Sequence, residues 1–347
     1  MLLLGISCLL LVGATLAVTQ TRHPSRSVRH ASTVTSSHLP SSATVSPSPT
    51  APLTSSASPT KDPSLKSSAS ARSAELVRLA KKAQALSKKR RNVRPVAEFT
   101  MANFNIQGAT HRGGIIGRTT RTRDLLLSHH VDVVALQEFQ RPQRQIFARV
   151  AGGTYGVFPG ATARSLDAEN SVAWRKDTFA LVRGETRPYR YFRGGIRNMP
   201  RVLLRNLKTG VELWVTSYHN PASCCGYGNA APYRAQDVRA QVTDATALVT
   251  ATKAPLIISG DMNDRAAYLC AMTTGVDMHS ADGGNHVGGC HVPPSPWIDW
   301  ILGTRDVEFS GYLRDRSGFV RSTSDHPIVV TRVRVTGQPG DGAKAGG

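Results

Sequence analysis

"PLIISGDMNDR", residues 255–265, is the stretch that decides the fold. A short apolar run breaks at Gly260 and is followed by Asp261 and Asn263. Apolar runs that end in this way are typical of buried strands whose ends carry polar residues. One strand end that offers a carboxylate and an amide is weak evidence alone. Its meaning depends on whether other strands supply partners.

The segments around this strand alternate between short apolar runs and helical patterns. Residues 99–108, 131–139, 171–182, 201–206, 210–220, 297–303 and 326–335 have the pattern of strands. Residues 119–130 and 233–252 have helical patterns. The chain shows no internal repeat. We expect one α+β domain over residues 96–335, in which mixed sheets are covered by helices.

Polar side chains recur at the ends of the predicted strands. Each has a simpler structural explanation by itself, such as capping a turn or pairing with an arginine. Taken together they point to a site, because a buried core avoids carboxylates without partners. The residues are Asn105, Glu138, His219, Asp261, Asn263, Asp299, Asp325 and His326.

Six short motifs carry a family resemblance. "NFNIQG", "LQEF", "SYHNP", "SGDMND", "IDWIL" and "TSDHPIV" stand in the order found in the endonuclease/exonuclease/phosphatase family. The chain resembles that family over about residues 97–334, and "GDMND" and "SDHPIV" are the most specific motifs. The resemblance implies a DNase I-like fold, a four-layer sandwich of two mixed β-sheets flanked by helices. It also implies hydrolysis of phosphate esters.

The resemblance assigns Glu138 as the principal metal ligand, with Asn105 and Asp325 beside it. A phosphodiester anion repels nucleophiles, so a cation such as Mg²⁺ is needed to neutralise it, with Mn²⁺ or Ca²⁺ as alternatives. Such hard cations prefer carboxylate and other oxygen ligands. The resemblance therefore predicts a divalent metal site.

The catalytic assignments come from the same motifs. His326 matches the general base that takes a proton from the attacking water, and Asp299 matches its carboxylate partner. Asp261 would orient the water. Asn263 and His219 would bind the phosphoryl oxygens and stabilise the developing charge.

Some family positions have no clear match. The family's tyrosine and one arginine are not evident, and Glu169 or Asp167 is our candidate carboxylate beside the first histidine. Residues 183–205 hold seven arginines. This stretch is either a solvated basic surface or a ridge that contacts substrate phosphates, and we select Arg197 as a phosphate contact.

The predicted function is an exported, metal-dependent phosphodiesterase, in particular a monomeric nuclease of low sequence specificity. Alternatives are a phospholipase or sphingomyelinase-like enzyme, a phosphatase of small esters, and a degenerate polyanion-binding module. An exposed aromatic hairpin would favour a membrane-acting enzyme, and "YRYF", residues 189–192, is the candidate. The intact set of polar residues argues against the degenerate module.

The N-terminal part has a different composition. Residues 1–18 are apolar and indicate a signal peptide or a membrane anchor. Residues 19–95 are predicted to be a disordered linker rich in Ser, Thr and Pro that ends in a basic helical segment. That segment, residues 72–94, is either solvated or in contact with an anionic surface. Residues 336–347 are predicted to be a flexible tail.

The charge and the cysteines indicate the class of binding partner and the cellular compartment. The formal charge is +20, yet residues 1–95 carry 14 of the 43 Lys and Arg and only two of the 23 Asp and Glu. The remainder is still basic, which favours a nucleic acid or another phosphodiester polyanion. Export favours disulfides, and we predict one between Cys270 and Cys290 while leaving Cys224 and Cys225 unassigned. The expected location is secreted or at the cell surface.

Overall fold

The computed structural model describes residues 63–163, 169–224 and 226–338. The predicted signal or anchor at residues 1–18, most of the predicted linker and residues 339–347 of the tail lie outside these residues. In the described part, no helix combines the length and the apolar character needed to cross a membrane.

The first helix, α1, covers Pro63–Asn92 and is longer than the predicted segment 72–94. All side chains of residues 71–89 are exposed to solvent. The three leucines on its predicted apolar face are 67%, 51% and 55% exposed at Leu76, Leu79 and Leu86. An exposed basic helix fits both a solvated segment and one that contacts an anionic surface, so both interpretations stay predictions.

Six strands form the first sheet, in the order β12-β13-β1-β2-β4-β3. Its two central strands, β1 and β2, are parallel, and its other pairs are antiparallel. The strands are β1 (Val96–Asn105), β2 (Val133–Gln137), β3 (Tyr155–Phe158), β4 (Ser171–Arg175), β12 (Val307–Asp315) and β13 (Ile328–Thr336).

Seven strands form the second sheet, in the order β10-β11-β9-β7-β6-β5, with β8 beside β9. Strand β9 is the strand of the opening stretch, and it pairs parallel with β7 and β8 and antiparallel with β11. The strands are β5 (Phe179–Arg190), β6 (Ile196–Asn206), β7 (Glu212–Thr216), β8 (Tyr218–His219), β9 (Leu256–Asp261), β10 (Met278–Ser280) and β11 (Asp299–Thr304).

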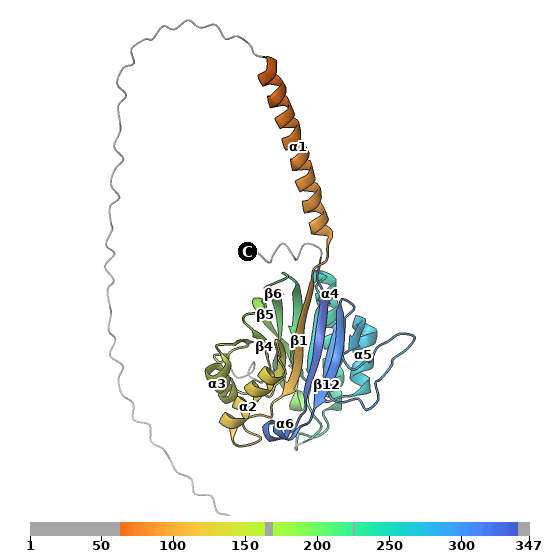
Figure 1. Ribbon diagram of the computed structural model, residues 1–347. Coiled ribbons are helices and arrows are strands. Elements are labelled where there is room, and N and C mark those ends of the chain that lie inside the picture. The colour runs from red at the N-terminus through yellow and green to blue at the C-terminus, as the bar shows by residue number, and fades with distance from the viewer. Residues whose placement is uncertain (1–62, 164–168, 225, 339–347) are drawn as a thin grey trace, which may run out of the picture. The chain divides into compact units, whose positions relative to one another are not determined.

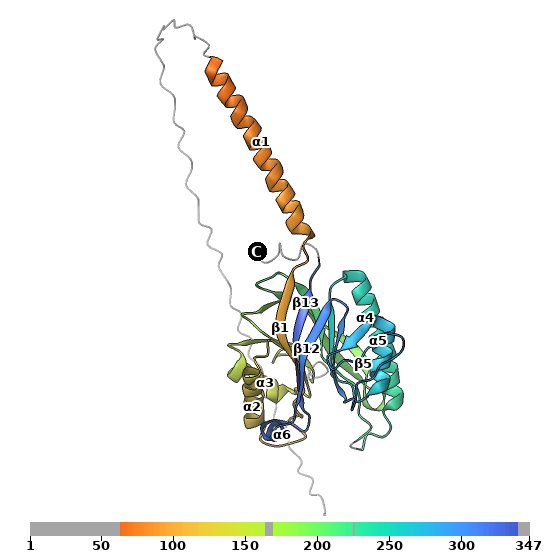
Figure 2. The same cartoon turned by 45° about the vertical axis from the view of Figure 1, so that its right-hand side comes forward.

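In the described ranges, six helical segments besides α1 accompany the sheets. Two groups cover opposite outer faces, as Figures 1 and 2 show: α2, α3 and α6 on the first sheet, and α4 and α5 on the second. The segments are α2 (Ile115–Ser128), α3 (Arg141–Ala151), α4 (Ala231–Thr252), α5 (Ala266–Val276), α6 (Gly318–Thr323) and the short 3₁₀ turn η2 (Phe192–Gly194).

Side-chain alternation along β1 explains the layering. Phe99 and Met101 lie in the core between the two sheets, whereas Ala102 and Phe104 lie in the core under the helices of the first sheet. Alternate residues of a strand face opposite sides, so a strand covered on both faces carries apolar residues on both of them. A third core lies between β9 and the helices α4 and α5. The predicted sandwich of two mixed sheets flanked by helices is confirmed.

Candidate active site

The strand register gathers the predicted polar residues at one edge. Parallel pairing places Asn105 beside Gln137, directly before Glu138, and places His219 beside Asp261. Antiparallel pairing of β11 with β9 brings Asp299 opposite Asp261. Residue 329 of β13 pairs with residue 103 of β1, which sets the segment before β13 next to the end of β1.

Asn105 links the two sheets at this edge. Its amide nitrogen donates to Oε1 of Glu138 at 3.0 Å and to Oδ2 of Asp261 at 3.1 Å. Its amide oxygen accepts from the backbone N–H of Gln107 at 3.0 Å, which fixes the orientation of the group. Asn105 is fully buried. Two carboxylates from different sheets therefore converge on one amide.

Glu138 is held as a carboxylate. Its Oε2 accepts from the backbone N–H of Gly108 at 2.7 Å and lies 2.6 Å from Nδ1 of His111. Burial alone would raise the pKa of Glu138, but His219, Gly108, Asn105 and His111 together lower it to about 2. Glu138 also has a φ of 52°, in the left-handed region that non-glycine residues rarely adopt. Its side chain is thus ionised and fixed in place.

His326 and Asp299 form a buried pair on the other side of Asp261. Nδ1 of His326 lies 3.0 Å and 3.2 Å from the two carboxylate oxygens of Asp299, so Nδ1 carries the proton that is donated. Nε2 lies 3.6 Å from Oδ2 of Asp261. Burial would lower the pKa of His326, but Asp299, Asp261 and Asp325 together raise it. The negative charge around the ring therefore favours the imidazolium.

His219 completes this side of the site. Its Nε2 lies 3.5 Å from Oδ2 of Asp261, and its Nδ1 lies 3.3 Å from the hydroxyl of Tyr191. Asp261 Oδ2 is thus surrounded by the two imidazoles and the amide of Asn105. The side chain of His219 is 7% exposed, which leaves little water to compete for these contacts.

Asn263 is positioned by the loop that follows β9. Its backbone N–H donates to Oδ1 of Asp261 at 3.0 Å, and its side-chain amide donates to the backbone oxygen of Asn220 at 2.8 Å. Its φ of 48° is again left-handed. The tight turn explains why "GDMND" delivers an acid and an amide side by side, since residues 261 and 263 both point to the same edge.

Asp325 lies beside His326 and takes a hydrogen bond from Ser324 Oγ at 3.3 Å. Burial has the largest effect on the pKa of Arg118 and lowers it. The negative charges of Asp325 and Glu138 act in the opposite direction and raise this pKa. The carboxylates of Asp325 and Glu138 therefore both act on one guanidinium group.

The residues fit a divalent cation. Glu138 offers a carboxylate that stays ionised at neutral pH, and Asp261 shares Asn105 with it. Ligand atoms of Asp261, Asp299 and His326 also lie within 4.8 Å of one another. Hard cations select such oxygen-rich donor sets. A bound cation would also reduce the repulsion between the carboxylates that converge here.

Arg197 has partners other than a substrate. It forms an ion pair with Glu169 at 2.8 Å, and its guanidinium lies 4.5 Å from the ring centre of Tyr191. Glu169 therefore supports Arg197 rather than His219, whose Nδ1 contacts Tyr191 instead. Asp167, the other carboxylate considered for this role, lies outside the described residues.

The ridge at residues 183–205 is partly neutralised by ion pairs. Arg183 and Arg201 pair with Glu185, and Arg187 pairs with Asp244. Two further ion pairs join Arg197 to Glu169 and Arg205 to Glu212. The sequence interpretation counted only the acid within the stretch and missed the partners on other segments. Five of the seven arginines thus share four carboxylates, and seven positive charges against four negative ones leave a smaller excess than the sequence of this stretch indicates.

Sequence reasoning missed three supporting residues. Tyr191 contacts His219, and His111 contacts Glu138. Arg118 is 2% exposed and donates to the backbone oxygens of Ile106 and Gln107, which shapes the loop after β1. Tyr191 lies in "YRYF", which was considered from the sequence as an exposed aromatic hairpin. His111 and Arg118 lie outside every motif.

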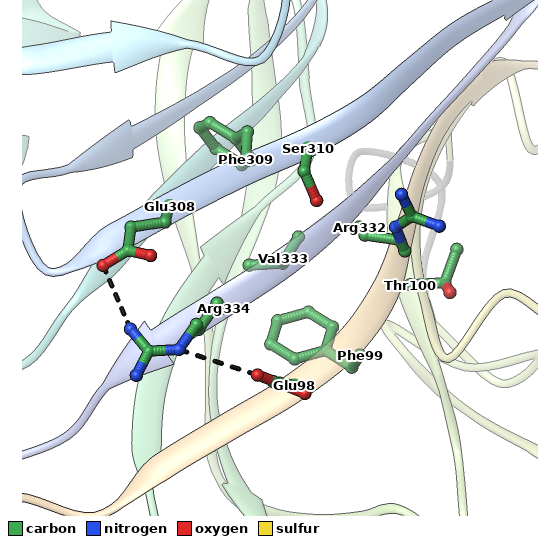
Figure 3. A pocket seen from close by; sticks show the side chains of 9 residues that line it. All are labelled: Glu98, Phe99, Thr100, Glu308, Phe309, Ser310, Arg332, Val333 and Arg334. Carbon is green, nitrogen blue, oxygen red and sulfur yellow. Dashed lines mark hydrogen bonds and ion pairs between the residues drawn. The ribbon is translucent and has the colours of Figure 1, made fainter.

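A separate hollow of about 370 Å³ lies at the other end of β1. Figure 3 shows Arg334 in it, reaching both Glu98 and Glu308, with ion-pair distances of 3.6 Å and 3.1 Å. Five residues of β1, about 16 Å at the rise of a strand, separate its lining residue Thr100 from Asn105. The hollow is therefore distinct from the polar edge.

The chain belongs to the Endonuclease/Exonuclease/phosphatase family, whose sequence profile matches residues 102–326, more than half of the chain. Members of this family are phosphoesterases, and they generally depend on divalent metal ions. Among curated proteins, none matches significantly.

Solved structures share the fold at low sequence identity. A family protein from Bacteroides vulgatus is 16% identical with a TM-score of 0.54, and the match covers 69% of this chain and 99% of that one. The human nocturnin catalytic domain with bound sulfate is 15% identical with a TM-score of 0.55, covering 71% and 99%. The mannosyl-6-phosphatase of Bacteroides thetaiotaomicron is 14% identical with a TM-score of 0.51, covering 68% and 99%. These likenesses establish the fold.

Proposed function

We propose that the protein is a metal-dependent phosphodiesterase, and within that class a nuclease of low sequence specificity. One observation carries the proposal: Asn105 joins the carboxylates of Glu138 and Asp261, and Asp261 in turn faces both His219 and the His326–Asp299 pair. A cation site and a proton-transfer pair on either side of one carboxylate suit attack of water on a phosphate.

Each residue then has a role. Glu138 would hold Mg²⁺, or Mn²⁺ or Ca²⁺, with Asp325 nearby, and the cation would neutralise the phosphate oxygens. Asn105 would join these ligands only through its amide oxygen after a flip of the group, because its nitrogen faces the carboxylates of Glu138 and Asp261. Asp261 orients the attacking water. His326 accepts its proton at Nε2, because Nδ1 is committed to Asp299. His326 reaches the neutral form that a base needs only when the negative charge around it is compensated.

His219 and Asn263 complete the proposed chemistry. His219 points Nε2 toward Asp261, where it can donate to a phosphoryl oxygen, and Tyr191 holds the opposite ring nitrogen. Asn263 uses one amide hydrogen on Asn220 and keeps a second for the substrate. Preorganised donors of this kind stabilise charge that develops in the transition state.

A membrane-acting enzyme receives less support. The aromatic candidate at residues 189–192 is engaged within the protein: Phe192 stacks on Tyr227 with ring centres 4.0 Å apart, and Tyr191 is buried against His219. An inserting hairpin would need these rings free. The alternative of a phosphatase of small esters stays within the same chemistry and is separated by the substrate assay below.

Export is also part of the proposal. The Cys270–Cys290 disulfide is present, with Cα atoms 5.4 Å apart, and Cys224 is disulfide-bonded as well. Disulfides persist mainly in oxidising compartments. Together with the apolar residues 1–18, they support a secreted or cell-surface location.

The test is hydrolysis of a phosphodiester by matched variants. Purified protein with Mg²⁺ should cleave bis(p-nitrophenyl) phosphate. It should also cleave plasmid DNA or RNA faster than sphingomyelin or inositol phosphates. His326→Ala should lower turnover by about 10²–10⁴-fold. The control Arg305→Gln, at an exposed ion pair with Asp277, should not change it. Hydrolysis that is equal in wild type and His326→Ala would contradict the proposal.

A further inference from the structure

Four residues form an arginine–tryptophan cluster: Trp297, Arg265, Arg314 and Arg316. The guanidinium carbons of Arg316, Arg265 and Arg314 lie 4.0 Å, 5.4 Å and 5.6 Å from the centre of the indole ring. Three cationic groups on one aromatic ring exceed the single contact that ordinary surface packing produces. No motif or family assignment above accounts for them.

The cluster lies next to the proposed catalytic residues. Trp297 stands two residues before Asp299. Burial raises the pKa of Asp299, His326 opposes this rise, and Trp297 lies close enough to the carboxylate to make a smaller contribution that lowers it. Arg314 pairs in the sheet with Val329, three residues after His326. Burial and the carboxylate of Asp282 raise the pKa of Tyr312 to about 12, and Arg314, Asp299 and Arg316 also lie close enough to affect it. Segments before β11, after β9 and at the end of β12 thus meet at the same edge.

Within the described part of the chain, the three guanidinium groups have no carboxylate partner. Among the residues that the structure describes, none of the three makes an ion pair, and Arg314 donates only to the backbone oxygen of Ser295, at 3.2 Å. The neighbouring Asp315 is paired with His129 at 3.2 Å, and Asp299 is paired with His326. Arg265 and Arg316 are exposed to solvent. This contrasts with residues 183–205, where five arginines form ion pairs with four carboxylates.

Charge and geometry define the ligand. Like charges held together repel one another, so the arrangement is most favourable when anions lie between them. The indole ring fixes the guanidinium planes, and their remaining N–H groups can form the paired hydrogen bonds that phosphate oxygens accept. A single small ester offers one phosphate, whereas a polynucleotide offers several at regular spacing.

We propose that the arginine–tryptophan cluster binds the phosphates of a nucleic-acid strand that flank the phosphate at the catalytic edge. This inference rests on the proposed function and specifies its substrate class. The main contact with a polyanion is then the arginine–tryptophan cluster, and not the Arg-rich residues 183–205. The cluster then sets affinity for a polymer and takes no part in bond cleavage.

The test compares two triple variants that lose the same charge. The cluster variant carries Arg265→Gln, Arg314→Gln and Arg316→Gln. The control variant carries three changes at exposed sites on α3, on α4 and after β11, namely Arg149→Gln, Arg239→Gln and Arg305→Gln. Binding of a fluorescent oligothymidylate is measured by anisotropy in EDTA, at several salt concentrations, so that no cleavage occurs.

The cluster variant should bind the oligonucleotide at least about tenfold more weakly at low salt. Each phosphate contact contributes about 0.7 to the salt slope on a single strand, so the slope should fall by about 2. The control variant should keep most of the affinity and slope. Turnover of bis(p-nitrophenyl) phosphate with Mg²⁺ should be unchanged in both variants, and this readout also reports separately whether the proposed function holds.

Three results would overturn the inference. Unchanged affinity and slope in the cluster variant would show that the arginines are only a solvated surface. Equal weakening in both variants would show a general charge effect. A cluster variant that loses binding to phosphatidylserine vesicles but keeps the oligonucleotide would assign the surface to lipid headgroups. Circular dichroism of each variant confirms that it is folded.

Discussion

Asp237 is a buried acid whose ionisation should oppose folding. It lies on α4, is 1% exposed, and accepts the backbone N–H of Arg190 at 2.7 Å through Oδ1. Its Oδ2 is buried and has no hydrogen-bond partner among the described residues. Burial raises the pKa of Asp237 from 3.8 to about 7, against a smaller lowering by Arg190. The contact with Arg190 also fixes the chain directly before Tyr191.

The sign of the effect follows from proton linkage. With a raised pKa, the folded state binds the proton more tightly than the unfolded state does, so stability falls as the pH rises from about 4 to about 7. The difference of roughly three pKa units corresponds to about 4 kcal/mol at most. Asp237→Asn keeps Oδ1 as the acceptor for Arg190 and removes the ionisation. The variant should therefore be more stable than wild type at neutral pH by up to about 4 kcal/mol.

Urea unfolding of wild type and Asp237→Asn at a series of pH values measures this directly. Their difference in free energy of unfolding should be small near pH 4 and should grow until about pH 7, because only one group separates the two proteins. Asp277→Asn, at an exposed ion pair, is the control and should stay within about 1 kcal/mol of wild type. A difference between wild type and Asp237→Asn that does not change with pH would refute the reasoning.

Further predictions concern other parts of the chain. Peptide mapping without reduction should recover Cys270 joined to Cys290, and replacing both by Ser should cost about 3 kcal/mol because the bond closes a loop of about 20 residues; free thiols in the folded protein would contradict this. A chain that begins at Arg72 should keep full specific activity on a soluble ester, since residues 19–70 lack apolar content for folding; a tenfold loss would show that they contribute to the site. Asn263→Ala should lower turnover by about 10²-fold and, because Asn263 has a positive φ and donates to Asn220, should also cost roughly 1–2 kcal/mol of stability; an unchanged rate would remove Asn263 from the transition state.

Most of the fold could be predicted because its signals are local. The apolar run at residues 256–258 and the Gly at 260 specify a buried strand end without knowledge of its neighbours. The short helix α5 was not predicted, since its sequence, "AAYLCAMTTGV", has no polar face and resembles a buried strand as much as a helix. Its burial against α4 and β9 is a tertiary effect.

The candidate site could be predicted only as a set of residue types. Strand ends indicated that Asn105, Asp261 and His326 meet, but the amide bridge from Asn105 to two carboxylates depends on how the sheets face each other. How much of a segment's charge stays without an ion-pair partner could not be predicted from the sequence of that segment. Acids from distant segments, such as Asp244, neutralise the ridge, while Arg265 and Arg316 come together from segments about fifty residues apart.

The central claim is that Glu138 holds the cation on which hydrolysis depends. Its direct measurement is a Mg²⁺ titration of chelator-treated wild type and Glu138→Gln, followed by turnover of bis(p-nitrophenyl) phosphate. Wild type should be inactive in EDTA and saturate with Mg²⁺. Glu138→Gln keeps the size but loses the charge, so it should need at least about tenfold more Mg²⁺ and reach a much lower rate. Full activity of wild type in EDTA, or identical titrations of the two proteins, would contradict the claim.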